Sequence, residues 1–281
     1  MNDEYKKNPY NILNKLITLN EVNTILSTYG IKRSATNLDI YQLAFVHKSY
    51  MRTKYKDILL DTKPENTIEL FDTCNERIEY LGDSILGACI SSYNFERYEE
   101  EDEGFLSKMK TKIVNGKKLA DLARNIGLGE WAIISSYAEE NNEGRDNTKI
   151  LEDIFESFIG AIYLDFNSSC TSRIENEDIG LGFQYCNIFI QNVVERHIDF
   201  TELITNEDNY KDVLSKIFTQ SYQCKANYFE LSCEGIGKNK IYTMGVKDNQ
   251  GRLLGKGSDR SKKLAEQICA KEALIRLGAL Y

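Results

Sequence analysis

The sequence has few of the residue types on which several common classes of protein depend. Its 281 residues include two histidines, two prolines and one tryptophan, so chemistry that relies on a histidine base has few candidates. The seven cysteines form no Cys-x-x-Cys pair and do not cluster with the histidines. An odd number of cysteines at irregular spacing argues against a disulfide framework and against a zinc site. Free thiols in a reducing compartment are the simpler interpretation.

Long apolar runs are also absent. No stretch of eighteen apolar residues occurs, and the start M-N-D-E-Y-K-K-N-P-Y has neither an apolar core nor a cleavage-like site of a signal peptide. We therefore expect no membrane segment and an intracellular, cytoplasmic location, with the nucleus as an alternative. At 42% hydrophobic and 28% charged residues, the composition is that of a soluble globular protein long enough for one large or two ordinary domains.

One stretch, Asn75 to Leu86, places acidic side chains at helical spacing. In a helix, Glu76, Glu79 and Asp83 lie on neighbouring turns of one face, and apolar residues lie largely on the other. Carboxylates stacked in this way repel one another, and a bound cation would relieve the repulsion. Taken alone, this pattern is more often a solvated helix face than a metal site.

A second stretch, Ile150 to Asp165, favours a metal site over a solvated helix face. Asp153 and Glu156 lie among residues that are nearly all apolar, which is typical of a core helix. Buried carboxylates must be paired or bound to a metal. If the two helices pack together, Glu79 and Asp83 join Asp153 and Glu156 in one cavity. With no lysine expected nearby, this is an all-oxygen site of the kind that Mg²⁺ or Mn²⁺ prefers.

These stretches resemble the ribonuclease III family in their order and spacing. The resemblance rests on E-R-I-E-Y-L-G-D-S, on E-D-E-G-F-L-S (Glu101 to Ser107), on I-L-E-D-I-F-E-S-F-I-G-A-I-Y-L-D and on an upstream A-F-V-H-K-S-Y (Ala44 to Tyr50). Chance supplies one such motif but hardly all of them together. The resemblance covers about residues 35 to 280.

The C-terminal quarter differs in charge and in periodicity. From Asp208 to Tyr281 there are 13 Lys+Arg and 8 Asp+Glu, against 22 and 35 in the rest. An acidic body and a basic tail suggest that metal chemistry and substrate capture are divided between two domains. Three short strands are expected at 228–233, 241–247 and 252–256, with one helix before them at 210–220 and one after them at 261–277. This α-β-β-β-α order resembles a double-stranded RNA-binding domain.

The basic residues of this tail are the candidate RNA contacts. The strongest motif is G-K-G-S-D-R-S-K-K-L-A-E-Q, Gly255 to Gln267, whose cations would meet phosphates. Two positions depart from the family: Lys216 stands where a glutamate is usual, and Lys238, in G-I-G-K, where a histidine is usual. Both changes add charge, so we expect RNA binding that is more salt-dependent and less discriminating. The predicted contacts are Lys216, Lys238, Lys256, Arg260, Lys262 and Lys263.

The resemblance implies a mainly α fold. An N-terminal extension (1–34) is expected to precede an all-helical catalytic domain (35–200), a linker (201–209) and a small α+β RNA-binding domain (210–281). Within the N-terminal extension we expect a short helix around Ile12 to Leu19. Within the catalytic domain we expect exposed insertion loops at 52–73 and 167–182, and one basic amphipathic helix from Phe105 to Asn125. The lysines of that helix face either phosphates or solvent. His47 is expected to be structural.

The resemblance also implies an activity, which is metal-dependent hydrolysis of phosphodiester bonds in double-stranded RNA. Direct ligands of Mg²⁺, or of Mn²⁺ in its place, would be Glu79, Asp83, Asp153 and Glu156. Asp83 and Glu156 would be the catalytic residues, with Glu156 needed for cutting but not for binding. Glu76 and Glu103 would lie just outside the ligands or toward a partner subunit. A single catalytic domain implies a homodimer that leaves short 3′ overhangs.

Two other functions compete with this interpretation. The first is a relative that has lost catalysis and only binds or sequesters double-stranded RNA; such relatives typically lose an acidic ligand, whereas all four are present here. The second is an unrelated metal-dependent phosphohydrolase of small nucleotides, which would have no need of the basic tail. Comparing metal-dependent cleavage with duplex binding separates these alternatives.

Overall fold

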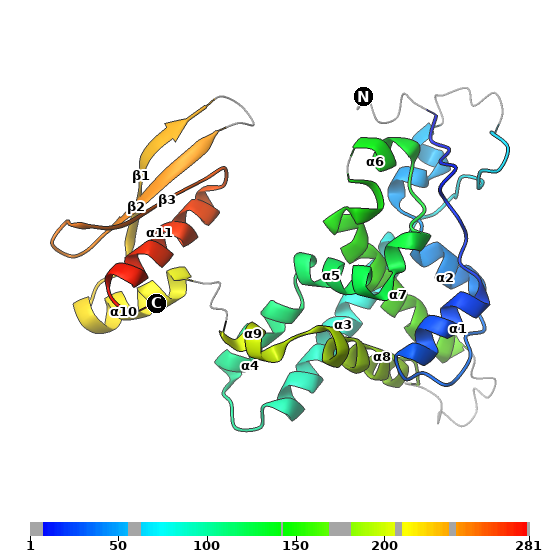
Figure 1. Ribbon diagram of the computed structural model, residues 1–281. Coiled ribbons are helices and arrows are strands. Elements are labelled where there is room, and N and C mark those ends of the chain that lie inside the picture. Colours follow the sequence, from blue (N-terminus) through cyan, green and yellow to red (C-terminus); the bar gives the residue numbers. More distant parts are fainter. Residues whose placement is uncertain are drawn as a thin grey trace. The chain divides into compact units, whose positions relative to one another are not determined.

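A computed structural model describes residues 8–55, 63–141, 143–168, 181–205, 210–235 and 240–279. The chain divides into two compact units, Met1–Phe200 and Thr201–Tyr281, called here the N-terminal and C-terminal units. The helices and strands named below show that the first unit is helical and the second combines helices with a sheet (Figure 1). The predicted fold class, mainly α with a small α+β domain, is confirmed.

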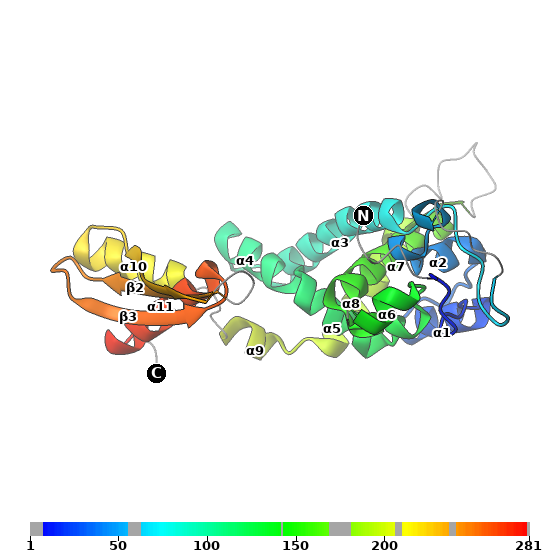
Figure 2. The ribbon, with the colours of Figure 1, turned by 90° about the horizontal axis from the view of Figure 1, so that it is seen from above.

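Two long helices form the centre of the N-terminal unit. They are α3 (Glu76–Arg97) and α7 (Thr148–Ser168), and they pack against each other (Figures 1 and 2). Helix α7 is buried on nearly all sides, as its apolar sequence predicts, and Leu151, Phe155 and Phe158 have almost no exposed surface. The helix with two of the predicted metal ligands is therefore the core of the unit.

Shorter helices surround this pair. They are α2 (Leu38–Ala44), α4 (Glu103–Ile113), α5 (Gly116–Ile126), α6 (Ser136–Asn141) and α8 (Leu181–His197), with 3-10 turns at Lys48–Tyr50, Arg52–Tyr55, Leu128–Trp131 and Gly144–Asp146. The single helix predicted from Phe105 to Asn125 is wrong. The Asn115 side chain accepts a hydrogen bond from the Lys118 amide and caps a new helix there. Gly127 ends α5 at φ +84°, as the sequence suggested.

The N-terminal extension packs as part of this unit. The short helix predicted around Ile12 to Leu19 is wrong, because helix α1 spans Leu19–Thr28 instead. The preceding segment is held open by Asn14, whose side-chain amide donates to the Ile134 carbonyl at 3.0 Å and accepts from the Ile134 amide at 3.2 Å. These bonds replace the local ones that a helix would need. Val22 and Leu26 of α1 are fully buried.

The two predicted insertions are described only in part. Most described residues of the 52–73 segment are exposed, as predicted, but Tyr55 and Leu70 are buried and anchor it, and the Arg52 amide donates to the Phe71 carbonyl at 2.8 Å. Residues 56–62 and 169–180 lie outside the described residues. The predicted linker begins inside helix α9 (Phe200–Thr205), and residues 206–209 are not described.

The C-terminal unit follows the predicted α-β-β-β-α order. Helix α10 (Tyr210–Tyr222) precedes strands β1 (Asn227–Glu234), β2 (Ile241–Lys247) and β3 (Leu253–Asp259), and α11 (Lys262–Arg276) ends the unit. The strands pair antiparallel in the order β1-β2-β3. Gly255 and Gly257 let α11 approach the sheet, since a Cβ on Gly257 would lie 2.4 Å from the Ala265 carbonyl oxygen.

Candidate active site

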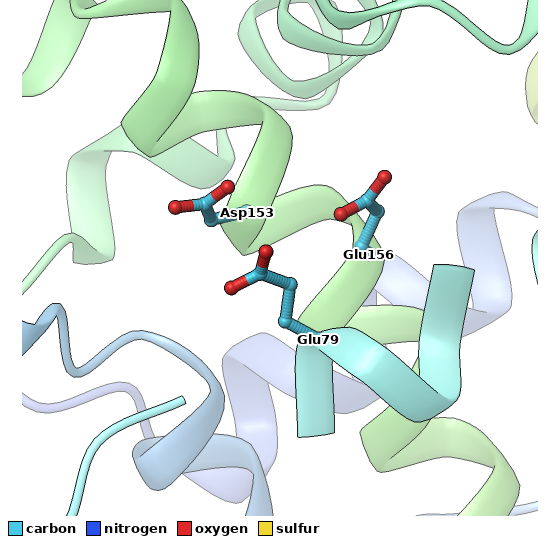
Figure 3. Close-up of side chains that lie close together, drawn as sticks. All are labelled: Glu79, Asp153 and Glu156. Carbon is cyan, nitrogen blue, oxygen red and sulfur yellow. The ribbon is translucent and has the colours of Figure 1, made fainter. Parts of the chain in front are cut away.

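Three carboxylates from the two central helices converge on one small volume. Glu79 of α3 and Asp153 and Glu156 of α7 each offer an oxygen, and these oxygens lie within 4.8 Å of one another. Figure 3 shows the three side chains around the space between the helices. Asp153 and Glu156 are each only 6% exposed. The structure thus brings together three of the four predicted metal ligands.

Two glycines allow this convergence. A Cβ built on Gly82 would lie 1.8 Å from the backbone carbonyl oxygen of Glu156, and one on Gly160 would lie 2.4 Å from that of Ile78. Real side-chain carbons never approach backbone so closely, so only glycine fits at either position. The two helices therefore touch backbone to backbone beside the acidic residues, which is why short side chains can meet there.

The carboxylates raise one another's pKa values. Burial, followed by the charges of Asp83 and Glu152, raises the pKa of Glu156 to about 8. Burial and the charge of Asp153 raise the pKa of Glu79 to about 7. A divalent cation would favour the ionised forms of the same groups. The donor set, all carboxylate oxygen, fits Mg²⁺ or Mn²⁺.

One lysine lies among these acidic groups, contrary to the expectation that no lysine would be near. The Lys149 ammonium lies 2.8 Å from Asp153 Oδ1, 3.3 Å from Glu152 Oε2 and 3.9 Å from Glu79 Oε1. Partial burial lowers the pKa of Lys149, but the hydrogen bond and charge of Asp153 outweigh burial and raise it. The lysine is therefore protonated throughout the physiological range.

The other predicted acidic residues lie at the margin of this group. Asp83 is exposed on α3, near enough for its charge to raise the pKa of Glu156, but it is not among the three convergent carboxylates. Glu76 pairs with Lys48 at 3.3 Å. Glu103 begins α4 and accepts a hydrogen bond from the Ser107 hydroxyl at 2.8 Å. Their predicted roles as ligand or partner contacts stay predictions.

Sequence reasoning missed two members of the cluster, Lys149 and Glu152. Both precede Asp153 on α7, at positions i−4 and i−1. On a helix, residues three or four apart are neighbours, so Lys149 could have been placed beside Asp153 from spacing alone. Its contact with Glu79 could not, because that contact depends on how closely α3 and α7 pack.

His47 does not belong to the chemistry of this site. Its Nδ1 lies 2.9 Å from the Ser49 hydroxyl and accepts from the Ser49 amide at 3.2 Å. Burial, together with the charge of Lys48, lowers the pKa of His47 to about 4. The ring is therefore neutral and holds the turn before the acidic helix, in keeping with a structural role.

The predicted RNA contacts lie at several places on the C-terminal unit. Lys262 and Lys263 open α11, and Arg260 is exposed just before them. Lys262 pairs with Glu230 at 2.7 Å and lies over the Tyr242 ring. Of the other three predicted contacts, Lys216 lies on α10, Lys256 lies on β3 and Lys238 lies outside the described residues.

Lys216 of α10 is exposed and lines a hollow of about 320 Å³ with Asp212, Ser215, Thr219 and Gln220. Lys256 lies between Gly255 and Gly257, which face α11, so strand alternation puts its side chain on the opposite face of the sheet. Lys238 lies outside the described residues. The six residues remain predicted contacts.

Comparison with known families covers both units. Residues 37–179 match the family model described as ribonuclease-III-like, and residues 210–277 match the double-stranded RNA binding motif. Among the described residues, none of the helices combines the length and the apolar character needed to span a membrane.

Relatives of known name extend over most of the chain. Ribonuclease 3 of Chlorobium luteolum is 38% identical over 250 residues, which are 89% of this chain and 79% of that protein. The probable ribonuclease 3 of Acanthamoeba polyphaga mimivirus is 36% identical over 212 residues, 74% of this chain but only 35% of that longer protein. The solved nuclease domain of ribonuclease III from Campylobacter jejuni aligns with a TM-score of 0.48 at 25% identity, covering 64% of this chain and 99% of that domain.

Proposed function

Because the chain belongs to the ribonuclease III family of endoribonucleases, we propose that it hydrolyses phosphodiester bonds of double-stranded RNA with Mg²⁺ or Mn²⁺ held between α3 and α7. The observation that carries the proposal is the convergence of Glu79, Asp153 and Glu156 within 4.8 Å. Three oxygen donors on two packed helices form a rigid binding site for a hard divalent cation. The double-stranded RNA-binding motif of the C-terminal unit supports the choice of substrate.

Each acidic residue has a proposed part in the reaction. Glu79, Asp153 and Glu156 would hold the cation directly, and Asp83, whose charge acts on Glu156, would complete the ligand set. Divalent metal lowers the pKa of bound water and neutralises charge on the attacked phosphate. Burial of Asp153 and Glu156 limits the number of water molecules that compete for the ion. Glu156 and Asp83 are the residues on which cleavage should depend most.

The basic residues would bring the duplex to this acidic site. Lys216, Lys238, Lys256, Arg260, Lys262 and Lys263 supply positive charge for the phosphate backbone. Such contacts hold RNA without requiring metal, so binding and cutting are separable.

We further propose a homodimer through α3, with one catalytic site per subunit and cuts in both strands that leave short 3′ overhangs. The support is Tyr80, which is 79% exposed and follows Glu79 on the same helix. Aromatic side chains are enriched on surfaces that another subunit covers. Glu76 and Glu103 would then lie toward the partner.

The test compares cleavage with binding on the same RNA duplex. Glu156→Gln and Asp83→Asn should each reduce Mg²⁺-dependent cleavage by at least about 100-fold, since even the loss of a residue that only supports a metal ligand costs up to about 100-fold. Duplex binding in gel-shift assays should be unchanged. Glu100→Gln, an exposed acidic residue in the turn after α3, is the matched control and should cleave normally. Duplex binding without any cleavage by the unmodified protein would favour the alternative, a protein that only binds or sequesters RNA.

A further inference from the structure

The ammonium of Lys149 lies where a cation would bind. It is within 4 Å of carboxylate oxygens from Glu79, Glu152 and Asp153, and two of these residues, Glu79 and Asp153, belong to the convergent group described above. A lysine ammonium carries one positive charge and needs oxygen acceptors. It therefore neutralises part of the negative charge that a metal ion would otherwise neutralise.

The contacts of Lys149 exceed those of an ordinary helical ion pair. Pairing with Glu152 and Asp153, at i+3 and i+4, is common on exposed helices and contributes little to stability. The contact with Glu79 is different, because it crosses from α7 to α3 and joins the two helices that form the site. Asp153 is also buried, and a buried carboxylate without a cation is strongly unfavourable.

The ammonium is also free to leave. The Lys149 side chain is 64% exposed, and its four-carbon stem is flexible. A divalent ion bound by Asp153 and Glu79 would repel a positive charge a few ångströms away. The two cations therefore compete for the same carboxylates.

We propose that Lys149 is an internal counter-ion that takes the place of the divalent cation in the metal-free protein and is displaced when the metal binds. Metal binding is then an exchange of one ammonium for one ion. The lysine stabilises the metal-free site and weakens the apparent affinity for metal. This inference rests on the proposed function, since it assumes that these carboxylates bind the catalytic ion.

Mn²⁺ binding to the full-length protein tests the exchange without reference to catalysis. The metal-stripped protein is titrated with Mn²⁺ by calorimetry at pH 8.5, and its thermal unfolding is measured in EDTA. Lys149→Met keeps most of the apolar stem and removes the charge, and Lys149→Arg keeps the charge. Lys63→Gln removes a lysine that pairs with Glu69 at 3.3 Å, away from the acidic cluster, and is the matched control.

The exchange makes paired predictions. Lys149→Met should bind Mn²⁺ roughly three to ten times more tightly, the effect of removing one or two competing ion pairs. Its metal-free form should unfold at a temperature lower by roughly 2–4 °C. Lys149→Arg and Lys63→Gln should stay close to the unmodified protein in both measurements.

A simple helical ion pair predicts a different result: the unfolding temperature of Lys149→Met would fall and its affinity for Mn²⁺ would not change. Unchanged or weaker Mn²⁺ binding by Lys149→Met overturns the proposal. If Lys149→Met binds Mn²⁺ no more tightly but the unmodified protein cleaves duplex RNA with Mn²⁺ in the same preparation, only the exchange is refuted and the proposed function stands. If the unmodified protein neither binds Mn²⁺ nor cleaves, both proposals fail.

Discussion

Gly82 of α3 lies against the backbone carbonyl of Glu156 on α7, so close that a Cβ at Gly82 would be 1.8 Å from that oxygen. This contact between Gly82 and Glu156, the proposed catalytic glutamate, determines both how closely the two helices pack and how the site is arranged. A change in the packing therefore changes the site. The same holds on the other side, where Gly160 lies against Ile78. The distance between α3 and α7 sets the distance between Glu79 and the carboxylates of α7.

Gly82→Ala should separate the two helices and damage the site. We expect a loss of about 1–3 kcal/mol in the free energy of unfolding, as in overpacked cores, and much weaker Mn²⁺ binding. The matched control is Gly87→Ala on the same helix, where a Cβ would meet only the Lys110 side chain at an ordinary 3.5 Å. That change should be neutral or stabilising by up to about 1 kcal/mol, because alanine is the better helix former. Equal effects of the two changes on unfolding and on Mn²⁺ binding would contradict this role of Gly82.

The metal-free protein should become less stable as pH rises. Glu156 and Glu79 have pKa values of about 8 and about 7 in the folded state, above the ordinary value of 4.5. The folded state therefore holds protons that the unfolded state releases. The stability that these groups contribute is present below about pH 4.5 and is lost as pH rises through about 8.

Thermal unfolding in EDTA between pH 6 and pH 8.5 measures this effect. The unfolding temperature should fall with pH, and Glu156→Gln should flatten the dependence because its side chain does not titrate. Mn²⁺ binding should tighten over the same range, since the ligands must lose their protons. A pH-independent affinity for Mn²⁺ would show that the acidic group does not bind the ion.

The exposed ring of Tyr80 makes the proposed dimer testable. Tyr80→Glu places a charge at a residue of α3 that is 79% exposed in the single chain, and burying that charge in an interface is costly. We expect sedimentation velocity to show monomers in place of dimers. Ile12→Glu, which alters another exposed apolar side chain, 70% exposed on the N-terminal segment, should leave the dimer unchanged. A monomeric unmodified protein would refute the proposed assembly.

Much of the fold was predictable because it follows from patterns among residues that are close together in the sequence. The nearly all-apolar sequence of Ile150 to Asp165 determines α7 by itself, and Gly127 marks the end of α5. The segment before α1 was mispredicted because Asn14 bonds to Ile134, which is distant in sequence. In the site, the acidic residues were identifiable from spacing. The contact of Lys149 with Glu79 was not, because it depends on two glycines that let α3 and α7 touch.

The two lysines that open α11 should differ in their importance for RNA binding. Lys262 already pairs with Glu230 at 2.7 Å, so part of its charge is neutralised before RNA arrives. Lys263 is exposed, and no ion pair of its side chain is found among the described residues. A cation that is not already paired gains more from a phosphate, because it has no bond within the protein to give up.

Lys263→Gln should therefore weaken duplex binding more than Lys262→Gln does, and by a similar factor for duplexes of different sequence. Its loss should also reduce the slope of log affinity against log salt by about 1, the value expected for one phosphate contact. Fluorescence anisotropy with two unrelated duplexes at several KCl concentrations measures both quantities. Lys225→Gln, a lysine before β1, is the control and should change neither affinity nor slope. If Lys262→Gln instead costs as much as Lys263→Gln, the Glu230 pair does not compete with RNA.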